Sequence, residues 1–150
     1  MLRPDLVHRK LQLISEDLHR LVLFKDLSLA ELTSDFIKQA TVERLLERIV
    51  MRAIDVNEHL ISELATGEEL RTTRLGYRDT FLKLTELGVY SADFAERIAQ
   101  SVGLRNILVH DYNDVDHTIL HGAISHCLRD YLHYVESVNT FVAQDQSGVE

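Results

Sequence analysis

Three side chains that could transfer protons or bind phosphate lie within residues 103–112 of this 150-residue chain. They are Arg105, His110 and Tyr112: a permanent cation, an imidazole and a phenol. An imidazole that titrates near neutral pH and a guanidinium that pairs with phosphate oxygens can together support proton transfer around a phosphodiester. We therefore take this segment as the candidate catalytic site.

The position of Arg105 and His110 depends on where their helix ends. Residues five apart lie about 140° apart around a straight helix, so these two side chains would not share a face of one rigid helix. The polar run at 111–114 has the chemistry of a turn, which predicts that the helix ends near His110. Such an end would bring the guanidinium and the imidazole closer together.

Composition and charge limit the classes of protein that this chain can be. With 16 Lys and Arg against 24 Asp and Glu, the net charge is −8, which argues against a general nucleic-acid coat and confines any RNA contact to a small cleft. The single cysteine, Cys127, can form no disulfide within the chain and indicates a cytoplasmic protein. The longest apolar run, Leu21–Phe24, is too short to span a membrane.

One proline, six glycines and helical periodicity predict an all-α fold. The apolar stripes that would face the core are Val7, Leu11, Ile14, Leu18 and Leu21; then Val42, Leu46, Ile49, Ala53, Val56, Leu60 and Leu64; then Phe94, Ile98 and Val102; and finally Leu120, Ile124, Cys127, Tyr131, Val135, Val138 and Val142.

These stripes predict about five helices in one antiparallel bundle, with residues 1–150 forming a single domain. The expected ranges are about 4–25, from near Ser34 to Gly67, 77–87, from a Ser91 cap to near His110, and from an Asp116 cap to a polar tail that begins at about 144. Ser28 and Glu31 form a capping-box pattern, which fits either a short helix or a simple turn.

The candidate site resembles a known family. Arg105-Asn106-Ile107-Leu108-Val109-His110-Asp111-Tyr112 is similar to the motif of the HEPN superfamily, specifically its HepT-like ribonuclease toxins: Arg, any four residues, His, any residue, Tyr, usually with asparagine after the arginine. Residues 52–61, residues 77–81 with the following Leu87-Gly88, and Asp116 look like further segments of these toxins. The resemblance covers roughly residues 4–140.

This resemblance implies a metal-independent endoribonuclease that needs no cofactor and cleaves messenger or transfer RNA as a homodimer. Arg105 would bind the scissile phosphate, and His110 would act as general base or general acid. Asn106 would either orient these groups or hold the interface. Asp55 either supports Arg105 from a neighbouring helix or belongs to a solvated polar face.

Tyr112 has two interpretations. It either stacks on a base or binds the phosphate, or it is the residue at which the toxin is silenced. HepT-like toxins typically pair with an MntA-like nucleotidyltransferase antitoxin that transfers AMP onto a tyrosine in or beside the motif, and the added negative charge and bulk would repel and block RNA.

Two other functions fit parts of the sequence. One is a non-catalytic HEPN binding module that partners a minimal nucleotidyltransferase. The other is a metal-binding bundle, because His117 and His121 are spaced to share a metal ion. No third ligand completes a recognised pattern, so packing or exposed histidines are the favoured interpretation, with no metal site.

Overall fold

The computed structural model describes residues 2–65, 75–104 and 116–147. Its helices are α1 (Pro4–Leu21), the 3-10 turn η1 (Val22–Phe24), α2 (Leu29–Ser34), α3 (Phe36–Leu64), α5 (Tyr77–Glu86), α6 (Ala92–Ala99) and α8 (His117–Ser147). Residues 101–104 form one more helical turn, and these described ranges contain no strand, which confirms the all-α fold class. None of the described helices has the length and apolar character needed to cross a bilayer.

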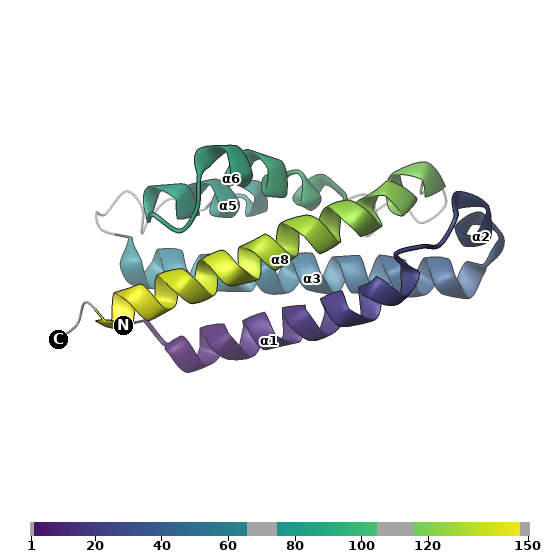
Figure 1. Cartoon of the computed structure of the whole chain (residues 1–150). Helices are drawn as coiled ribbons and strands as arrows, with labels where there is room; N and C mark the ends of the chain where they lie inside the picture. The colour runs from purple at the N-terminus through teal and green to yellow at the C-terminus, as the bar shows by residue number, and fades with distance from the viewer. Residues whose placement is uncertain (1, 66–74, 105–115, 148–150) are drawn as a thin grey trace.

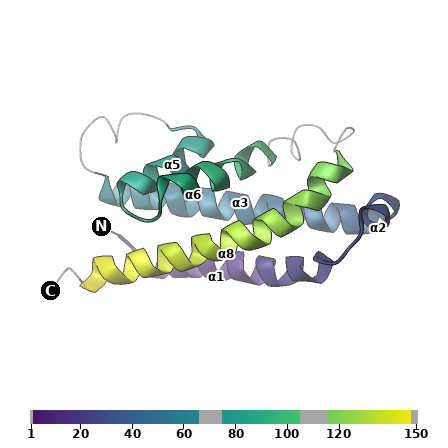
Figure 2. The same cartoon turned by 45° about the horizontal axis from the view of Figure 1, so that its top comes forward.

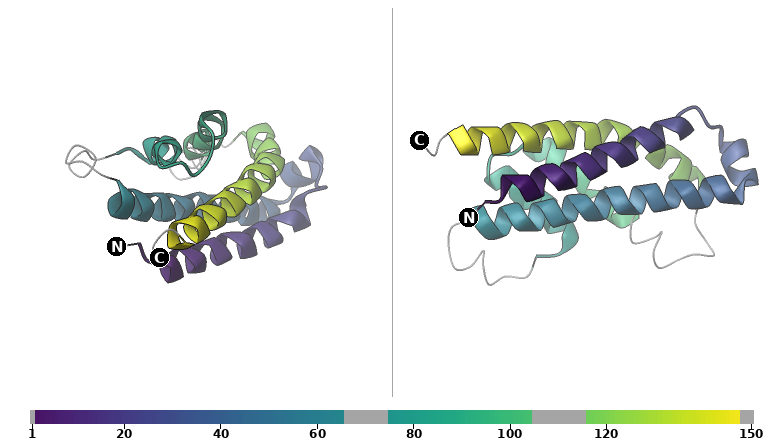
Figure 3. Two further views of the ribbon diagram at one scale, coloured as in Figure 1. Left: turned by 60° about the vertical axis from the view of Figure 1, so that its left-hand side comes forward. Right: turned by 90° about the horizontal axis from the view of Figure 1, so that it is seen from below.

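The long helices α1, α3 and α8 lie side by side, and the shorter α5 and α6 cover the opposite face of α3 and α8 (Figures 1 and 3). Helix α1 runs antiparallel to α3, since Lys10 and Asp17 pair with Asp55 and Arg48 respectively. The bundle differs from a fully antiparallel one because α3 and α8 run in the same direction. The segment containing α5 and α6 carries the chain back, so that α8 starts beside the start of α3 (Figure 1).

The core contains the side chains that the periodicity predicted. All five stripe residues of α1, the three of the 94–102 segment and the seven of α8 are buried, and so are those of α3 except the partly buried Leu64. At roughly 1.5–3 kcal/mol for each fully buried aliphatic or aromatic side chain, these stripes supply the main driving force for assembling the bundle. Because each helix buries its own stripe, the stripe of α8 determines which face of this helix points inward.

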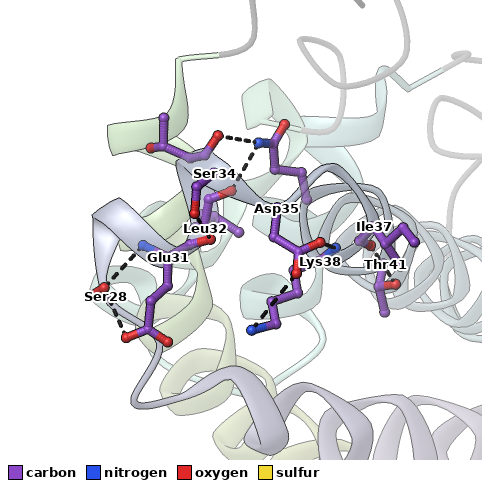
Figure 4. A network of polar contacts seen from close by, with 10 residues as sticks. Ser28, Glu31, Leu32, Ser34, Asp35, Ile37, Lys38 and Thr41 are labelled. Atoms are coloured by element: carbon purple, nitrogen blue, oxygen red, sulfur yellow. Dashed lines mark hydrogen bonds and ion pairs between the residues drawn. The ribbon is translucent and has the colours of Figure 1, made fainter.

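Side-chain caps define where the helices begin. The Ser28 hydroxyl accepts a hydrogen bond from the Glu31 amide at the start of α2, and the Asp35 carboxylate accepts one from the Lys38 amide at the start of α3 (Figure 4). Ser91 caps α6 in the same way. Gly88 has a φ of 85° and ends α5 as predicted, because this left-handed conformation is costly for residues with a Cβ.

Several boundaries differ from the sequence-based ranges. The α-helical part of the first helix ends at Leu21, and η1 completes the segment that was expected to be helical to 25. The Ser28 pattern starts a separate short helix, α2, rather than a turn. Helix α8 continues to Ser147, so the polar tail expected from 144 begins later than predicted. Helix α3 ends at Leu64, and the predicted stop at Gly67 lies outside the described residues.

A buried carboxylate joins α1 to α3. The Asp17 side chain is fully buried and lies 2.7 Å from Arg20, 3.1 Å from Arg48 and 2.7 Å from Arg52. Its position between Ile14 and Leu18 places it beside the apolar stripe, where an isolated charge would be costly. The three guanidinium groups compensate that cost, and the two from α3, Arg48 and Arg52, fix the register of the two helices.

A second buried polar cluster joins α3, α5 and α8. The Asn57 amide donates to the Thr80 hydroxyl, and the Tyr134 hydroxyl donates to the Asn57 side-chain oxygen and to the Ala53 carbonyl. All of these groups are buried, and each finds a partner, as buried polar atoms require. The cluster holds α8 against the middle of α3.

Candidate functional site

The whole motif lies outside the residues that the structure describes. This holds for Arg105, Asn106, His110 and Tyr112 and for the turn expected at 111–114. Leu104 before the motif and Asp116 after it are the nearest described residues.

The exit from the motif is a capped helix start. The Asp116 carboxylate accepts a hydrogen bond of 2.8 Å from the Thr118 amide, and its carbonyl accepts one of 3.0 Å from the Leu120 amide. The predicted role of Asp116 as the cap of the last helix is confirmed. This cap fixes the beginning of α8 only six residues after His110 in the sequence.

Two histidines attach this helix start to α2 and α3. His117 Nε2 lies 3.1 Å from Gln39 Oε1, and the Gln39 amide nitrogen donates to the Leu32 and Thr33 carbonyls at the end of α2. His121 Nε2 lies 2.6 Å from the Leu27 carbonyl oxygen. Because both partner atoms are acceptors, each Nε2 carries the proton that it donates.

These bonds explain the pair of histidines without a metal. Both Nε2 atoms are engaged in protein hydrogen bonds, which supports packing histidines over a shared metal ion. Among the described residues, no three histidine, cysteine or carboxylate side chains are placed to hold an ion. Nearby, burial raises the pKa of the Glu43 carboxyl, and the charge of His117 opposes that increase.

A cleft of about 600 Å³ is lined by residues that come before and after the motif in the sequence. Arg97 of α6 and residues of the 101–104 turn line it, and so do residues of the first half of α8. Figure 2 shows the backbones of these segments. Leu104, which precedes the motif in the sequence, and Thr118 of α8 both line it, together with the buried side chains of Leu46 and Val50 of α3. The cleft therefore includes the residue directly before the motif.

Two arginines that share one carboxylate line this cleft. Arg97 Nε and Arg129 Nε lie 3.0 and 3.1 Å from the same oxygen of Asp130, whose side chain is only 9% exposed. The Arg97 guanidinium also lies over the Phe94 ring, 5.4 Å from its centroid. The two arginines and Asp130 together carry a net charge of about +1 in a chain whose total is −8.

Sequence reasoning missed this arginine pair, although one signal was available. Asp130 lies between Cys127 and Tyr131 on the buried side of α8, and a carboxylate beside an apolar stripe indicates a buried ion pair. The same signal marks Asp17 in α1. Each carboxylate has one arginine partner close to it in the sequence, Arg129 or Arg20, but neither pattern reveals the distant partners, which come from other helices.

Other titratable groups in the cleft are unsuited to nucleophilic catalysis. Burial raises the pKa of the Cys127 thiol and of the Tyr131 hydroxyl, which also lies 2.7 Å from the Ser101 hydroxyl. Both groups therefore stay protonated at neutral pH, and a protonated thiol is a poor nucleophile. Neither group is therefore a candidate nucleophile.

Asp55, the one predicted site residue within the described ranges, lies on the surface of α3. Its carboxylate is 51% exposed and lies 3.3 Å from Lys10 of α1. This contact agrees with the solvated polar face that was one of its two interpretations. The supporting role toward Arg105 stays a prediction, since Arg105 is not described.

Solved structures define the class of this fold. A tri-AMPylated HEPN toxin of Shewanella oneidensis in complex with an MNT antitoxin superposes with a TM-score of 0.79 at 23% identity, over 92% of this chain and 99% of the other. A toxin–antitoxin structure with AMP-PNP gives a TM-score of 0.79 at 24% identity, over 91% of this chain and 98% of the other. The fold is that of a HEPN toxin.

Sequence comparison gives the family. The family described as Ribonuclease HepT-like matches residues 12–138, and the chain belongs to this family. The tRNA nuclease HepT of Aphanizomenon flos-aquae is 35% identical over 141 residues, which cover 94% of this chain and 92% of the relative. The mRNA nuclease HepT of S. oneidensis is 26% identical over 109 residues, which cover 73% of this chain and 78% of that relative.

Proposed function

We propose that this chain is the endoribonuclease toxin of a toxin–antitoxin pair and acts on cytoplasmic messenger or transfer RNA. The observation that carries the proposal is the complete Arg-x4-His-x-Tyr motif at 105–112, inside the region that matches the ribonuclease family. The names of the two relatives, a tRNA nuclease and an mRNA nuclease, support an RNA substrate.

The proposed reaction uses side chains alone. One His110 removes the proton from a ribose 2′-hydroxyl, the freed oxygen attacks the adjacent phosphorus, and the 5′-oxygen leaves with a proton from a second acid. Arg105 binds the phosphate and stabilises the charge on its equatorial oxygens. The products end in a 2′,3′-cyclic phosphate and a 5′-hydroxyl, and no step requires a metal ion.

A homodimer supplies the second acid. With two motifs facing each other across the interface, the partner subunit's His110 takes the role opposite to that of the first. Two copies of Arg105 in one cleft also provide the local positive field that a chain of charge −8 lacks overall. Asn106 orients one of these groups or holds the interface, and Asp55 has a supporting role.

An RNA with a single deoxyribose at the cleaved position should resist cleavage there, because the attacking oxygen is missing. The normal RNA should be cut equally well with EDTA and with added magnesium, and mass spectrometry should find cyclic phosphate ends. Gel analysis of both substrates checks the prediction, with a deoxyribose two positions away as the control. Cleavage that stops in EDTA would contradict the mechanism.

We also propose that an MntA-like nucleotidyltransferase silences the toxin by transferring AMP to Tyr112. The other tyrosines support this choice. Tyr131 and Tyr134 are at most 1% exposed, and the Tyr90 hydroxyl donates to the Phe81 carbonyl from a mostly buried position. Among the described tyrosines, only Tyr77 is exposed, at 41%. Tyr112 and Tyr77 are therefore the two residues to compare.

A Tyr112→Phe variant should take up no AMP when incubated with the antitoxin and ATP. Tyr77→Phe should be modified like the wild type, because its ring lies outside the motif. Intact-mass and peptide mass spectrometry check both variants, since each AMP adds one phosphodiester. Modification of Tyr112→Phe at another tyrosine would overturn the assignment.

A further inference from the structure

We propose that the cleft between α6 and α8 binds the RNA strand next to the scissile phosphodiester, with Arg97 and Arg129 contacting its phosphates. This inference rests on the proposed nuclease function and assigns substrate-binding residues outside the motif. It is carried by three observations: the place of the cleft, the free ends of its two guanidinium groups and its apolar surface.

The cleft includes the residue directly before the motif in the sequence and extends along α8. Leu104 and Thr118 line it, and Tyr131 lines it thirteen residues further along α8 than Thr118. At 1.5 Å per residue, this distance is about 20 Å. A strand cut at the motif would thus have room for a few nucleotides along α8.

The arginine pair presents phosphate-binding groups in a fixed position. Asp130 engages both arginines through Nε, and among the described residues no ion pair or hydrogen bond occupies their terminal Nη atoms. The two side chains are 50% and 58% exposed. Free Nη groups form the planar fork that matches two oxygens of a phosphate, and anchoring at Nε reduces the entropy lost on binding.

The exposed lining of the cleft suits nucleosides. Ile119 is 50% exposed and provides apolar contact for a base, whereas the exposed Gln100 and Thr118 place polar groups along the same cleft. Single-stranded nucleic acid is commonly bound by such a combination of a positive groove and base contacts. An RNA strand is therefore a better match for this cleft than a purely apolar ligand.

The test measures cleavage of a short RNA by Arg97→Gln, Arg129→Gln and the double variant. Arg78→Gln is the matched control, because Arg78 is similarly exposed and pairs with Glu96 on α6 but does not line the cleft. Each cleft substitution should raise KM by about tenfold, as expected for a charge-assisted hydrogen bond, and leave kcat within about twofold. The dependence of binding on salt should fall by about 0.7 in slope for each arginine lost.

Three results would count against the proposal or its basis. If the wild type cleaves RNA and both cleft variants match Arg78→Gln, the strand does not follow this cleft and the nuclease function stands. If the cleft variants become monomers in light scattering, a second copy of the chain occupies the cleft and the proposal is overturned. If the wild type cleaves no RNA, the proposed function itself fails. Arg97→Lys and Arg129→Lys should keep part of the affinity that the glutamine variants lose, which separates charge loss from misfolding.

Discussion

Growth arrest and RNA cleavage should both disappear when Arg105 or His110 is replaced by alanine. Loss of a general acid or base costs about 10²–10⁴ in rate, and loss of a group that stabilises the charge of the transition state costs about 10²–10³. In a homodimer each substitution removes both copies of the side chain, so the effect falls at the upper end of these ranges. Induced expression in cells and single-turnover cleavage with purified protein measure it.

Matched controls separate this chemistry from general damage. Arg44→Ala removes an exposed arginine that pairs with Glu47 one turn away, and His8→Ala removes an exposed histidine of α1. Both should keep full toxicity. Arrest that persists in Arg105→Ala and His110→Ala would contradict the assignment. A wild type that leaves growth unchanged and RNA intact would favour the non-catalytic module that partners a nucleotidyltransferase.

Replacement of Asp17 by alanine should cause a large loss in the free energy of unfolding. The substitution leaves three arginines facing one another beside the core without their shared carboxylate. Removing one partner of such a buried network costs about 3 kcal/mol or more, which for a domain of this size lowers Tm by roughly 10 °C. Urea unfolding followed by circular dichroism measures the change in the free energy of unfolding.

Asp55→Ala is the control for this experiment. Asp55 also links α3 to α1, through Lys10, but the Lys10 and Asp55 side chains are 33% and 51% exposed. An exposed pair contributes about 0–1 kcal/mol, so this variant should unfold close to the wild type. Equal losses in the free energy of unfolding for the two variants would show that burial of Asp17 does not determine its contribution to stability.

The helices and their inward faces could be predicted from sequence because both are local properties. The stripe of α8, from Leu120 to Val142, repeats every three or four residues and is buried as expected. Ser91 and Gly88 mark helix ends through bonds to their immediate neighbours. Such signals need no knowledge of the rest of the chain.

The parallel course of α3 and α8 and the contents of the cleft could not be predicted, since they depend on which distant residues meet. His117 and Gln39 are 78 residues apart, and the spacing of His117 and His121 alone fits a metal pair as well as two hydrogen bonds to other elements. Arg97 and Asp130 are likewise separated by 33 residues. The motif was identified by its residue types and spacing, and its geometry is not described by the structure.

Cys127 has a practical consequence for testing the proposed homodimer. It is the one cysteine of the sequence, it is buried, and burial raises the pKa of its thiol. A maleimide reagent should therefore react with a cysteine introduced at exposed Asn139 of α8 far faster than with Cys127. Each chain would then carry one dye or spin label at a chosen place, and the separation of two labels would report the arrangement of the pair in solution.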